Sequence, residues 1–244
     1  MKKQIIIAGD SNTFGLGCSD RLFYYDIQLN QWIGDIAQLS NGPSNFCWAS
    51  LLQKKFPEIE ILNLGVPAND NLSIATSIAN NINDNTIMVM CNGSFLDRIQ
   101  VANPRNNAIK SWIIGQDPRI GSGYNDPEQY KNAKLSYIQH LYHDKIGVNL
   151  GISSIFSAYG LATYYNAAFR WSMPTLTLDK HLSNFEQYRI PAFNTNYDFS
   201  GSNDLDFNKT MIAEDKGHPN EVGHKIYFER EIVNLVTGIL DTVK

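Results

Sequence analysis

Charged residues are scarce in this chain, and basic residues do not gather anywhere along it. Of its 244 residues, 18% are charged, and the formal net charge is −4. Proteins that bind nucleic acid or anionic membrane surfaces carry clusters of Lys and Arg, which this sequence lacks. We therefore expect no nucleic-acid partner and no electrostatic binding to a membrane.

Long apolar runs are missing as well. No stretch of about 18 consecutive apolar residues occurs, so the sequence predicts no membrane span. The first apolar run, Ile5 to Ala8, ends before Asp10 and is too short for the core of a signal peptide. We expect a cytoplasmic protein or a virion component synthesised in the cytosol.

Side chains that bind metals are few and widely spaced. The three cysteines, Cys18, Cys47 and Cys91, form no closely spaced pair. An odd cysteine count without an export signal predicts reduced thiols. His181 and His224 also lack a partner at metal-ligand spacing. We expect no metal and no organic cofactor.

The first apolar run is the most informative stretch that is present. An unbroken run from Ile5 to Ala8 is typical of a strand buried on both faces of a parallel sheet, and it stops at Gly9-Asp10-Ser11. Binding crevices lie beyond the carboxyl ends of such strands, which places Ser11 at the edge of a crevice. The same residues also favour a turn and a helix N-cap. The residues that follow the run, from Gly9 to Gly15, lack the Gly-Lys-Ser/Thr ending of a phosphate-binding loop.

Strands and helices are predicted to alternate after this run. Helices are expected at 44–55 and after Asn71 or Ser73, where Ile74, Ile78 and Ile82 repeat every four residues. Further strands are expected at 60–65 and 86–91. This alternation predicts an α/β fold, a three-layer α/β/α flavodoxin-like sandwich around a central parallel sheet.

The remaining segments are less regular. Residues 12–39 have no clear pattern, and 98–124 read as a long excursion. Helices are predicted at 127–144 and 152–169 and a fourth strand at 174–178, whereas 181–208 remain unassigned. No repeat or low-complexity block marks a boundary. We therefore expect one domain over 1–244 with an aromatic-rich insertion at about 98–208.

A possible base for Ser11 appears near the end of the chain. The sequence Asp215-X-X-His218-Pro219 precedes a helix with a broad apolar side. At this spacing the carboxylate can hydrogen-bond one ring nitrogen and leave the other facing a serine. Pro219 suits the first turn of that helix, where its missing N–H is not needed. A polar loop with an incidental histidine is the alternative.

Taken together, the two ends of the chain resemble the SGNH/GDSL hydrolase superfamily. The likeness rests on Gly9-Asp10-Ser11 after the first strand and on Asp215-X-X-His218 before the last helix. It implies that Ser11 attacks an ester carbonyl and that Asp215 and His218 complete a catalytic triad. It also implies that the backbone N–H groups of Ser11 and Gly65 stabilise the oxyanion.

One block departs from the family pattern, which has Gly-X-Asn-Asp after the third strand. Here the chain has Asn92-Gly93-Ser94, followed by Arg98. Counting from the strand end puts Ser94 at the position of the family's oxyanion-binding Asn, and a shift by two residues puts Asn92 there. Both side chains can donate a hydrogen bond. Arg98 is expected to pair with Asp97 or another nearby acid.

These observations lead to two hypotheses about function. The first is a serine hydrolase of carboxylic esters, with a short acyl group such as O-acetyl on a glycan as the favoured substrate. The second, suggested by the altered third block, is a degenerate hydrolase fold that serves as a binding or structural module, for instance in a phage particle or a cell-surface assembly. The sequence does not predict the oligomeric state.

Overall fold

The computed structural model describes residues 2–26, 29, 31–96, 98–102, 109–113, 127–141, 143–172 and 218–242. Three of the features predicted from sequence lie outside these residues: Asp215, the strand at 174–178 and the segment 181–208.

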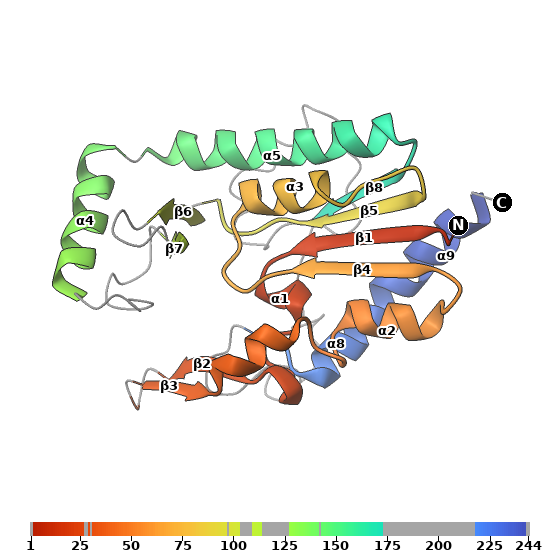
Figure 1. The fold of residues 1–244 in the computed structure, drawn as a ribbon, viewed down its shortest axis with the longest axis horizontal. Coiled ribbons are helices and arrows are strands. Elements are labelled where there is room, and N and C mark those ends of the chain that lie inside the picture. Colours follow the sequence, from red (N-terminus) through yellow and green to blue (C-terminus); the bar gives the residue numbers. More distant parts are fainter. Residues whose placement is uncertain are drawn as a thin grey trace.

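A parallel four-stranded sheet forms the centre of the described structure (Figure 1). Its strand order is β4-β1-β5-β8, and every neighbouring pair is parallel. The strands are β1 (Gln4–Gly9), β4 (Glu60–Gly65), β5 (Thr86–Asn92) and β8 (Ala168–Ser172). The predicted first three strands are confirmed, with bounds that differ by at most one residue from those expected.

The apolar run of β1 is divided between the two faces of the sheet, because successive strand side chains point in opposite directions. Ile6 and Ala8 lie in one buried cluster, and Ile5 and Ile7 lie in another. All of these side chains are fully buried. Burial on both faces explains why the run is continuous rather than alternating.

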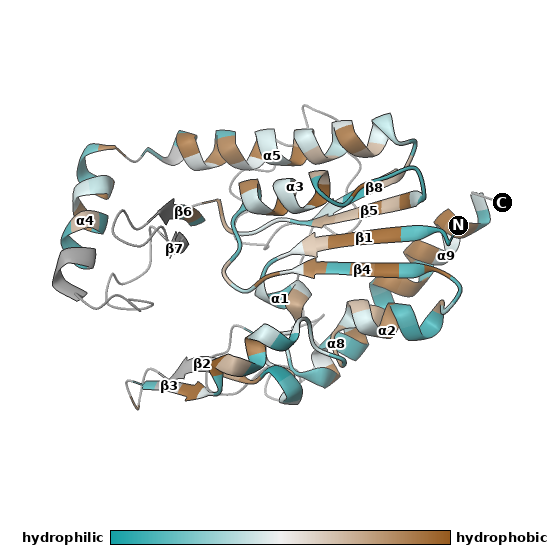
Figure 2. Ribbon diagram, viewed as in Figure 1, coloured by the Kyte–Doolittle hydropathy of each residue, from teal (hydrophilic) through white to brown (hydrophobic). Residues whose placement is uncertain are grey.

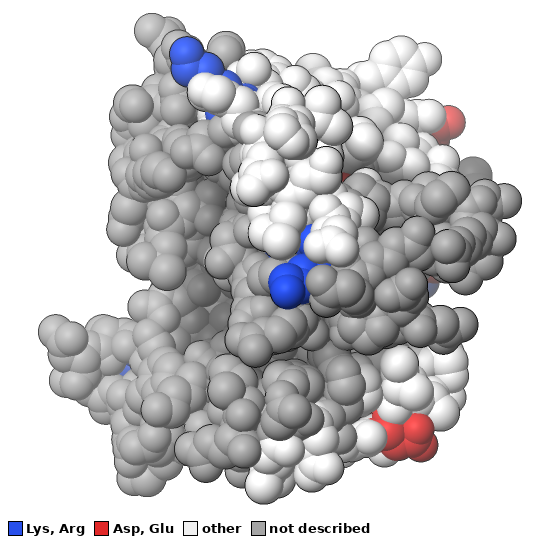
Figure 3. Space-filling view, turned by 90° about the vertical axis from the view of Figure 1, so that its left-hand side faces the viewer, with Lys and Arg blue, Asp and Glu red and all other residues white. Residues whose placement is uncertain are grey.

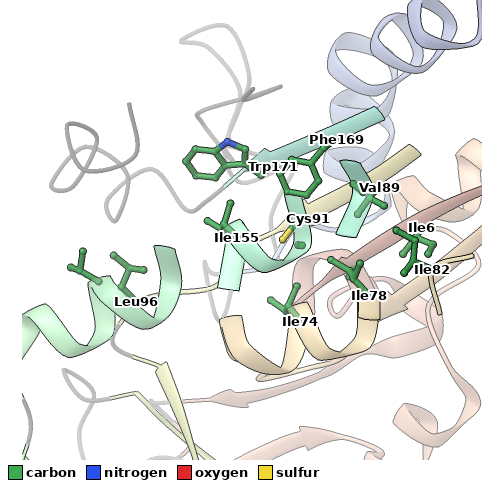
Figure 4. Packing of buried hydrophobic residues seen from close by; sticks show 14 residues of the cluster. Ile6, Ile74, Ile78, Ile82, Val89, Cys91, Leu96, Ile155, Phe169 and Trp171 are labelled. Atoms are coloured by element: carbon green, nitrogen blue, oxygen red, sulfur yellow. The ribbon is translucent and has the colours of Figure 1, made fainter. Parts of the chain in front are cut away.

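Helices cover both faces of the sheet. On one face, α3 (Asn71–Ala79) and α5 (Asp144–Tyr164) pack over β1, β5 and β8. Figure 4 shows the side chains that fill this layer, with Ile74 and Ile78 from α3 opposite Ile155 from α5. Each fully buried isoleucine stabilises the fold by about 1.5–3 kcal/mol.

The second face is covered by α2 (Trp48–Lys55) and by the C-terminal helices (Figure 1). These comprise α8 (Glu221–Tyr227), the π-helical turn η3 (Phe228–Ile232) and α9 (Val233–Thr242). The three-layer α/β/α arrangement predicted from the sequence is therefore the observed one.

Helix α5 is the most apolar long helix of the described residues, and brown segments run along much of it in Figure 2. By length and composition, its residues Lys145–Tyr164 suffice to cross a membrane. In the structure, Ile155, Ala158 and Ala162 of this helix pack into the core beside the sheet. One side of the helix thus packs against the core, and the absence of a membrane span stays a prediction.

Figure 3 shows few charged side chains among the described residues of the face that it draws. The described Lys and Arg side chains visible there lie apart from one another. The described part of this face therefore presents no extended basic patch.

Two predicted irregular regions contain hairpins that the sequence pattern did not reveal. Within 12–39 the structure has α1 (Ser11–Phe14), a hairpin and two 3-10 helices. The hairpin strands are β2 (Phe23–Asp26) and β3 (Gln31–Gly34), and the 3-10 helices are η1 (Ser19–Arg21) and η2 (Ile36–Asn41). Within 98–124, β6 (Arg98–Ala102) pairs antiparallel with β7 (Ile109–Ile113). Two-stranded ribbons outside a large sheet bury little apolar surface, so they leave a weak pattern.

The predicted helix at 152–169 was wrong at both ends. Helix α5 begins at Asp144 and ends at Tyr164, and β8 follows after three residues, so Phe169 lies in a strand rather than a helix. The aromatic residues there satisfy both a helical and a strand pattern, because both elements are buried. The predicted helix at 127–144 is confirmed as α4 (Pro127–His140), which ends earlier.

Candidate active site

Ser11 lies directly beyond the carboxyl end of β1, as predicted. Asp10 is the N-cap of the short helix α1, and its Oδ1 accepts a hydrogen bond from Asn12 N at 3.1 Å. Ser11 is the first residue of that helix, and its side chain is largely buried. The turn needs glycine at position 9, because a Cβ there would lie 2.1 Å from Thr13 Oγ1.

His218 meets Ser11 across the end of the sheet. The distance between His218 Nε2 and Ser11 Oγ is 3.0 Å, within hydrogen-bond reach. The two residues are 207 positions apart in the chain. The predicted proximity of these two side chains is thus observed. A hydroxyl and an imidazole at this distance are able to exchange a proton.

The loop that carries His218 is fixed by contacts on its C-terminal side. Asn220 caps α8, and its Oδ1 accepts hydrogen bonds from Val222 N and Gly223 N. Glu221 Oε1 accepts a hydrogen bond from Ser19 N at 2.6 Å, which ties this loop to the segment after α1. Partial burial acts to raise the pKa of the Glu221 carboxyl, but hydrogen bonds from Ser19 and from the backbone N–H of Glu221 itself outweigh it and lower the pKa.

The position of Asp215 relative to His218 stays a prediction, since Asp215 lies outside the described residues. His181 does so as well. His224, by contrast, is described, and it serves a structural role beneath the site. Its Nδ1 accepts a hydrogen bond from Trp48 N, the first residue of α2, at 3.4 Å. Burial, helped by the nearby His218, lowers the pKa of His224 to about 3, so the ring is neutral.

Asn92 is one of the two side chains proposed from sequence as a third oxyanion donor. It is the last residue of β5 and is fully buried. Its Nδ2 donates to Thr13 Oγ1 at 3.1 Å, and its Oδ1 accepts from Ser172 Oγ at 3.0 Å. The amide therefore links α1, β5 and β8 inside the protein.

Ser94, the other proposed donor, is also fully buried and engaged. Its Oγ lies 2.7 Å from Arg98 Nη1, which donates, and 3.4 Å from Asp10 Oδ2, which accepts. The structure shows Asp10 as an acidic partner of Arg98, with 3.3 Å between Nη1 and Oδ2, whereas Asp97 lies outside the described residues. In this geometry the hydroxyl proton of Ser94 points to a carboxylate.

Gly65 is needed where β4 meets α1. A Cβ at this position would lie 2.5 Å from Phe14 N, so the close approach requires glycine. Its own N–H donates to Asn63 Oδ1 at 2.9 Å. The predicted oxyanion donor at Gly65 thus already has a partner in this structure. Asn63 in turn donates to Thr13 O at 2.9 Å and so joins the two segments.

Sequence analysis missed Ala68, whose backbone has an unusual conformation. Its φ is 61°, a left-handed value that residues other than Gly, Asn and Asp rarely adopt. It lies in a turn closed by a hydrogen bond from Asn69 N to Val66 O. Val66 N and Asn69 Nδ2 both donate to Gly9 O, which holds the turn against the end of β1. Strained backbone next to a nucleophile is a pointer to function. Pro67 was the available sequence signal, because proline favours such a turn.

The three cysteines are free and buried, and none forms a disulfide. Burial raises the pKa of each thiol, which keeps the thiols protonated and unreactive. In the part of the chain that the structure describes, no group of three or more His, Cys, Asp or Glu side chains is arranged to hold a metal ion.

Several solved structures are similar to this chain. A G-D-S-L family lipolytic protein from Desulfitobacterium hafniense matches with a TM-score of 0.50 and 12% identity, covering 93% of this chain and 96% of its own. A member of the same family from Veillonella parvula matches at 0.46 and 15%, covering 95% and 98%. A carbohydrate esterase matches at 0.49 and 13%, covering 98% of this chain and 65% of its own.

At such low sequence identities, structural similarity is evidence for the fold alone. That evidence comes from the Desulfitobacterium hafniense structure. No family model matches the sequence, and no relative is found among curated proteins.

Proposed function

We propose that this chain, which has the fold of the SGNH/GDSL hydrolases, is a serine hydrolase that cleaves carboxylic esters. In this proposal Ser11 is the nucleophile and His218 is the general base. Asp215 orients the imidazole, as the spacing of the terminal block suggests. No metal or organic cofactor takes part.

The observation that carries the proposal is the distance of 3.0 Å between His218 Nε2 and Ser11 Oγ. A serine hydroxyl is a weak nucleophile until a neighbouring base accepts its proton. Both side chains also lie at the carboxyl ends of the parallel strands, where α/β folds place their binding sites.

In the first half of the reaction, Ser11 Oγ attacks the ester carbonyl carbon while its proton passes to His218 Nε2. The resulting tetrahedral oxyanion needs hydrogen-bond donors. The N–H of Ser11, at the N-terminus of α1, is one candidate, and the N–H of the exposed Ala68 is the second. Collapse of the intermediate breaks the bond to the alcohol oxygen, which takes the proton from His218 and leaves.

In the second half, water attacks the acyl group on Ser11 and gives its proton to His218. The tetrahedral intermediate collapses, the carboxylic acid leaves, and Ser11 regains its proton. One ester and one water thus yield one alcohol and one acid, and the protein returns to its starting state.

The direct test is hydrolysis of p-nitrophenyl acetate with and without a fluorophosphonate that reacts with activated serines. We expect turnover that the reagent abolishes, together with a mass increase on the peptide that contains Ser11. Lack of both turnover and labelling in the folded wild-type protein would overturn the proposal.

For the substrate, we favour a short acyl group such as O-acetyl on a glycan. This choice rests on the many aromatic residues between positions 98 and 208, since aromatic side chains suit sugar binding as well as cores. A series of p-nitrophenyl esters from acetate to decanoate, measured beside an acetylated polysaccharide, tests it. A preference for long chains would favour a lipid substrate instead.

A second candidate function is a binding module built on the same fold. It is favoured by the engagement of Asn92 and Ser94 within the protein, which leaves neither side chain directed at an oxyanion. Loss of one such donor typically lowers kcat by about 10²–10³. A folded protein that binds an acetylated glycan without hydrolysing it, and whose Ser11 resists the fluorophosphonate, would support this alternative.

A further inference from the structure

A buried polar cluster lies directly beside the proposed nucleophile. Asp10, Ser94 and Arg98 are each at least nine-tenths buried; Asp10 follows β1, and Ser94 and Arg98 lie four residues apart after β5. Arg98 is the first residue of β6, the hairpin strand that sequence analysis read as irregular. The reaction steps derived above do not use Arg98.

A single nitrogen of Arg98 contacts three loops. Nη1 lies 2.7 Å from Ser94 Oγ, 3.3 Å from Asp10 Oδ2 and 3.3 Å from Asn69 O. These acceptors follow β5, β1 and β4 respectively, the three adjacent strands whose carboxyl ends surround Ser11.

The contact with Asp10 acts on the backbone of Ser11. One carboxylate oxygen of Asp10 caps α1 by accepting from Asn12 N, and the other oxygen accepts from Arg98 and Ser94. With both oxygens held, the carboxylate cannot rotate away from the cap. The cap fixes the start of the helix, and Ser11 is the next residue.

The contact with Asn69 acts on the strained turn. Arg98 binds the carbonyl of the residue that follows Ala68, and Gln100 Nε2 lies 3.4 Å from Asn69 Oδ1. Gln100 N also donates to Asp70 Oδ2 at 3.1 Å. The start of β6 thereby pins this turn next to the end of β1.

We infer that Arg98 is a positioning residue. It holds the start of α1, which carries Ser11, and the turn at Ala68 in the relative positions that catalysis requires. The inference rests on the proposed function, because it assigns Arg98 a role in that same site. A planar guanidinium suits this role, since it offers several donors in fixed directions, whereas a lysine ammonium is a flexible point charge.

The kinetic test compares Arg98→Met, Arg98→Lys and Arg170→Met with the wild-type protein. Arg170 is the control, because its guanidinium donates to Phe169 O within its own strand, away from this cluster. We expect Arg98→Met to lower kcat about 10²-fold, as displacement of reacting groups by about 1 Å does, with KM changed less than about threefold. Arg98→Lys should recover part of that loss, and Arg170→Met should keep the wild-type kcat.

A purely structural role predicts a different pattern. It would lower the melting temperature of Arg98→Met while leaving kcat per folded molecule and the rate of fluorophosphonate labelling unchanged. That result would overturn the inference. If Arg98→Met does not fold, Ser94→Ala replaces it: this variant removes the shortest contact of Arg98 but keeps its charge pair with Asp10, and about a tenfold loss of kcat is expected.

Hydrogen exchange gives a readout that does not depend on turnover. In Arg98→Met, amide exchange should speed up in residues 10–15 and 66–70, whereas Arg170→Met should leave these segments unchanged. Unchanged exchange in both variants would overturn the positioning role. An inactive wild-type protein with faster exchange in Arg98→Met would instead refute the proposed hydrolase and keep the loop-holding role.

Discussion

The imidazole of His218 lies within hydrogen-bond distance of the Ser11 hydroxyl, with 3.0 Å between Nε2 and Oγ. The chain places one residue beyond its first strand and the other before its last helices, so only the closed fold brings them together. This contact requires the loop at 218–220 to stay beside α1. The hydrogen bond from Ser19 N to Glu221 Oε1 helps by tying this loop to η1, which follows α1 in the chain.

The first prediction concerns this pair. Ser11→Ala and His218→Ala should each lower kcat for p-nitrophenyl acetate by more than about 10³-fold. The double variant should be little worse than either single one, because the two groups act as a unit. Steady-state kinetics on the purified, folded variants measures this.

Two exposed residues provide matched controls for that experiment. Ser157 lies on the exposed side of α5 and donates to Ser153 O, and His140 is exposed on α4. Alanine at either position should leave kcat unchanged. Retention of most activity in Ser11→Ala would show that another nucleophile is at work.

The second prediction addresses Asp215. The fall in kcat caused by Asp215→Ala should be about 10²-fold smaller than the fall caused by Ser11→Ala or His218→Ala. The reason is that the carboxylate orients the imidazole and stabilises its charged form but does not itself accept the proton. Asp84→Ala, at an exposed aspartate, is the control. An effect on kcat no larger than that of the control would remove Asp215 from the site.

The ends of the chain were the parts most readable from sequence. The buried run of β1 and the Asp-X-X-His spacing are both local patterns, and each predicts a position at an end of the sheet. Their pairing in space followed from the topology of a parallel sheet. The order β4-β1-β5-β8 places β1 in the interior, as that reasoning requires.

The third block could not be resolved from sequence for a physical reason. Whether Asn92 or Ser94 faces the site depends on where β5 ends and on which neighbours take up each side chain. Most of those neighbours come from distant segments of the chain. They are Thr13 and Ser172 for Asn92, and Asp10 and Arg98 for Ser94. Residue spacing contains no information about such partners. The same holds for Arg98 and Asp10, which are 88 positions apart.

The third prediction separates structural from catalytic roles at Asn92. Asn92→Ala leaves the buried hydroxyls of Thr13 and Ser172 without their amide partner. It should lower the free energy of unfolding by about 1–3 kcal/mol, the usual cost of unsatisfied buried groups. The kcat of the folded fraction should stay within about threefold of wild type.

Urea unfolding and kinetics on the same sample measure both quantities, with Asn45→Ala at an exposed site as control. A loss of kcat of about 10² or more, with stability unchanged, would assign the oxyanion donor to Asn92 after all.

The fourth prediction is a pH dependence of stability that arises from His224. Burial lowers its pKa in the folded protein to about 3, below the unfolded value of about 6.5. Between these values the unfolded state binds the additional proton, so this residue makes the free energy of unfolding fall as the pH falls. The slope from one such group approaches about 1.4 kcal/mol per pH unit.

His224→Gln tests this, since glutamine still offers an acceptor to Trp48 N but does not titrate. Urea unfolding between pH 4.5 and 7.5 should show a flatter pH dependence for the variant than for the wild type. Equal slopes would mean that the imidazole gains a proton in the folded state.

The fifth prediction concerns the strained turn next to the nucleophile. Ala68 has a φ of 61°, which costs an L-residue about 1–2 kcal/mol, and glycine adopts this value freely. Ala68→Gly should therefore raise the free energy of unfolding by about 0.5–1 kcal/mol, after allowing for the greater freedom of glycine in the unfolded chain. Asn166→Gly is the matched control: its φ is 55°, but asparagine tolerates this region, so the gain should be smaller. Because Ala68→Gly keeps the backbone N–H, its kcat should not fall. A lower free energy of unfolding in Ala68→Gly would contradict the prediction, and it would show that the methyl group of Ala68 makes a packing contact that outweighs the strain.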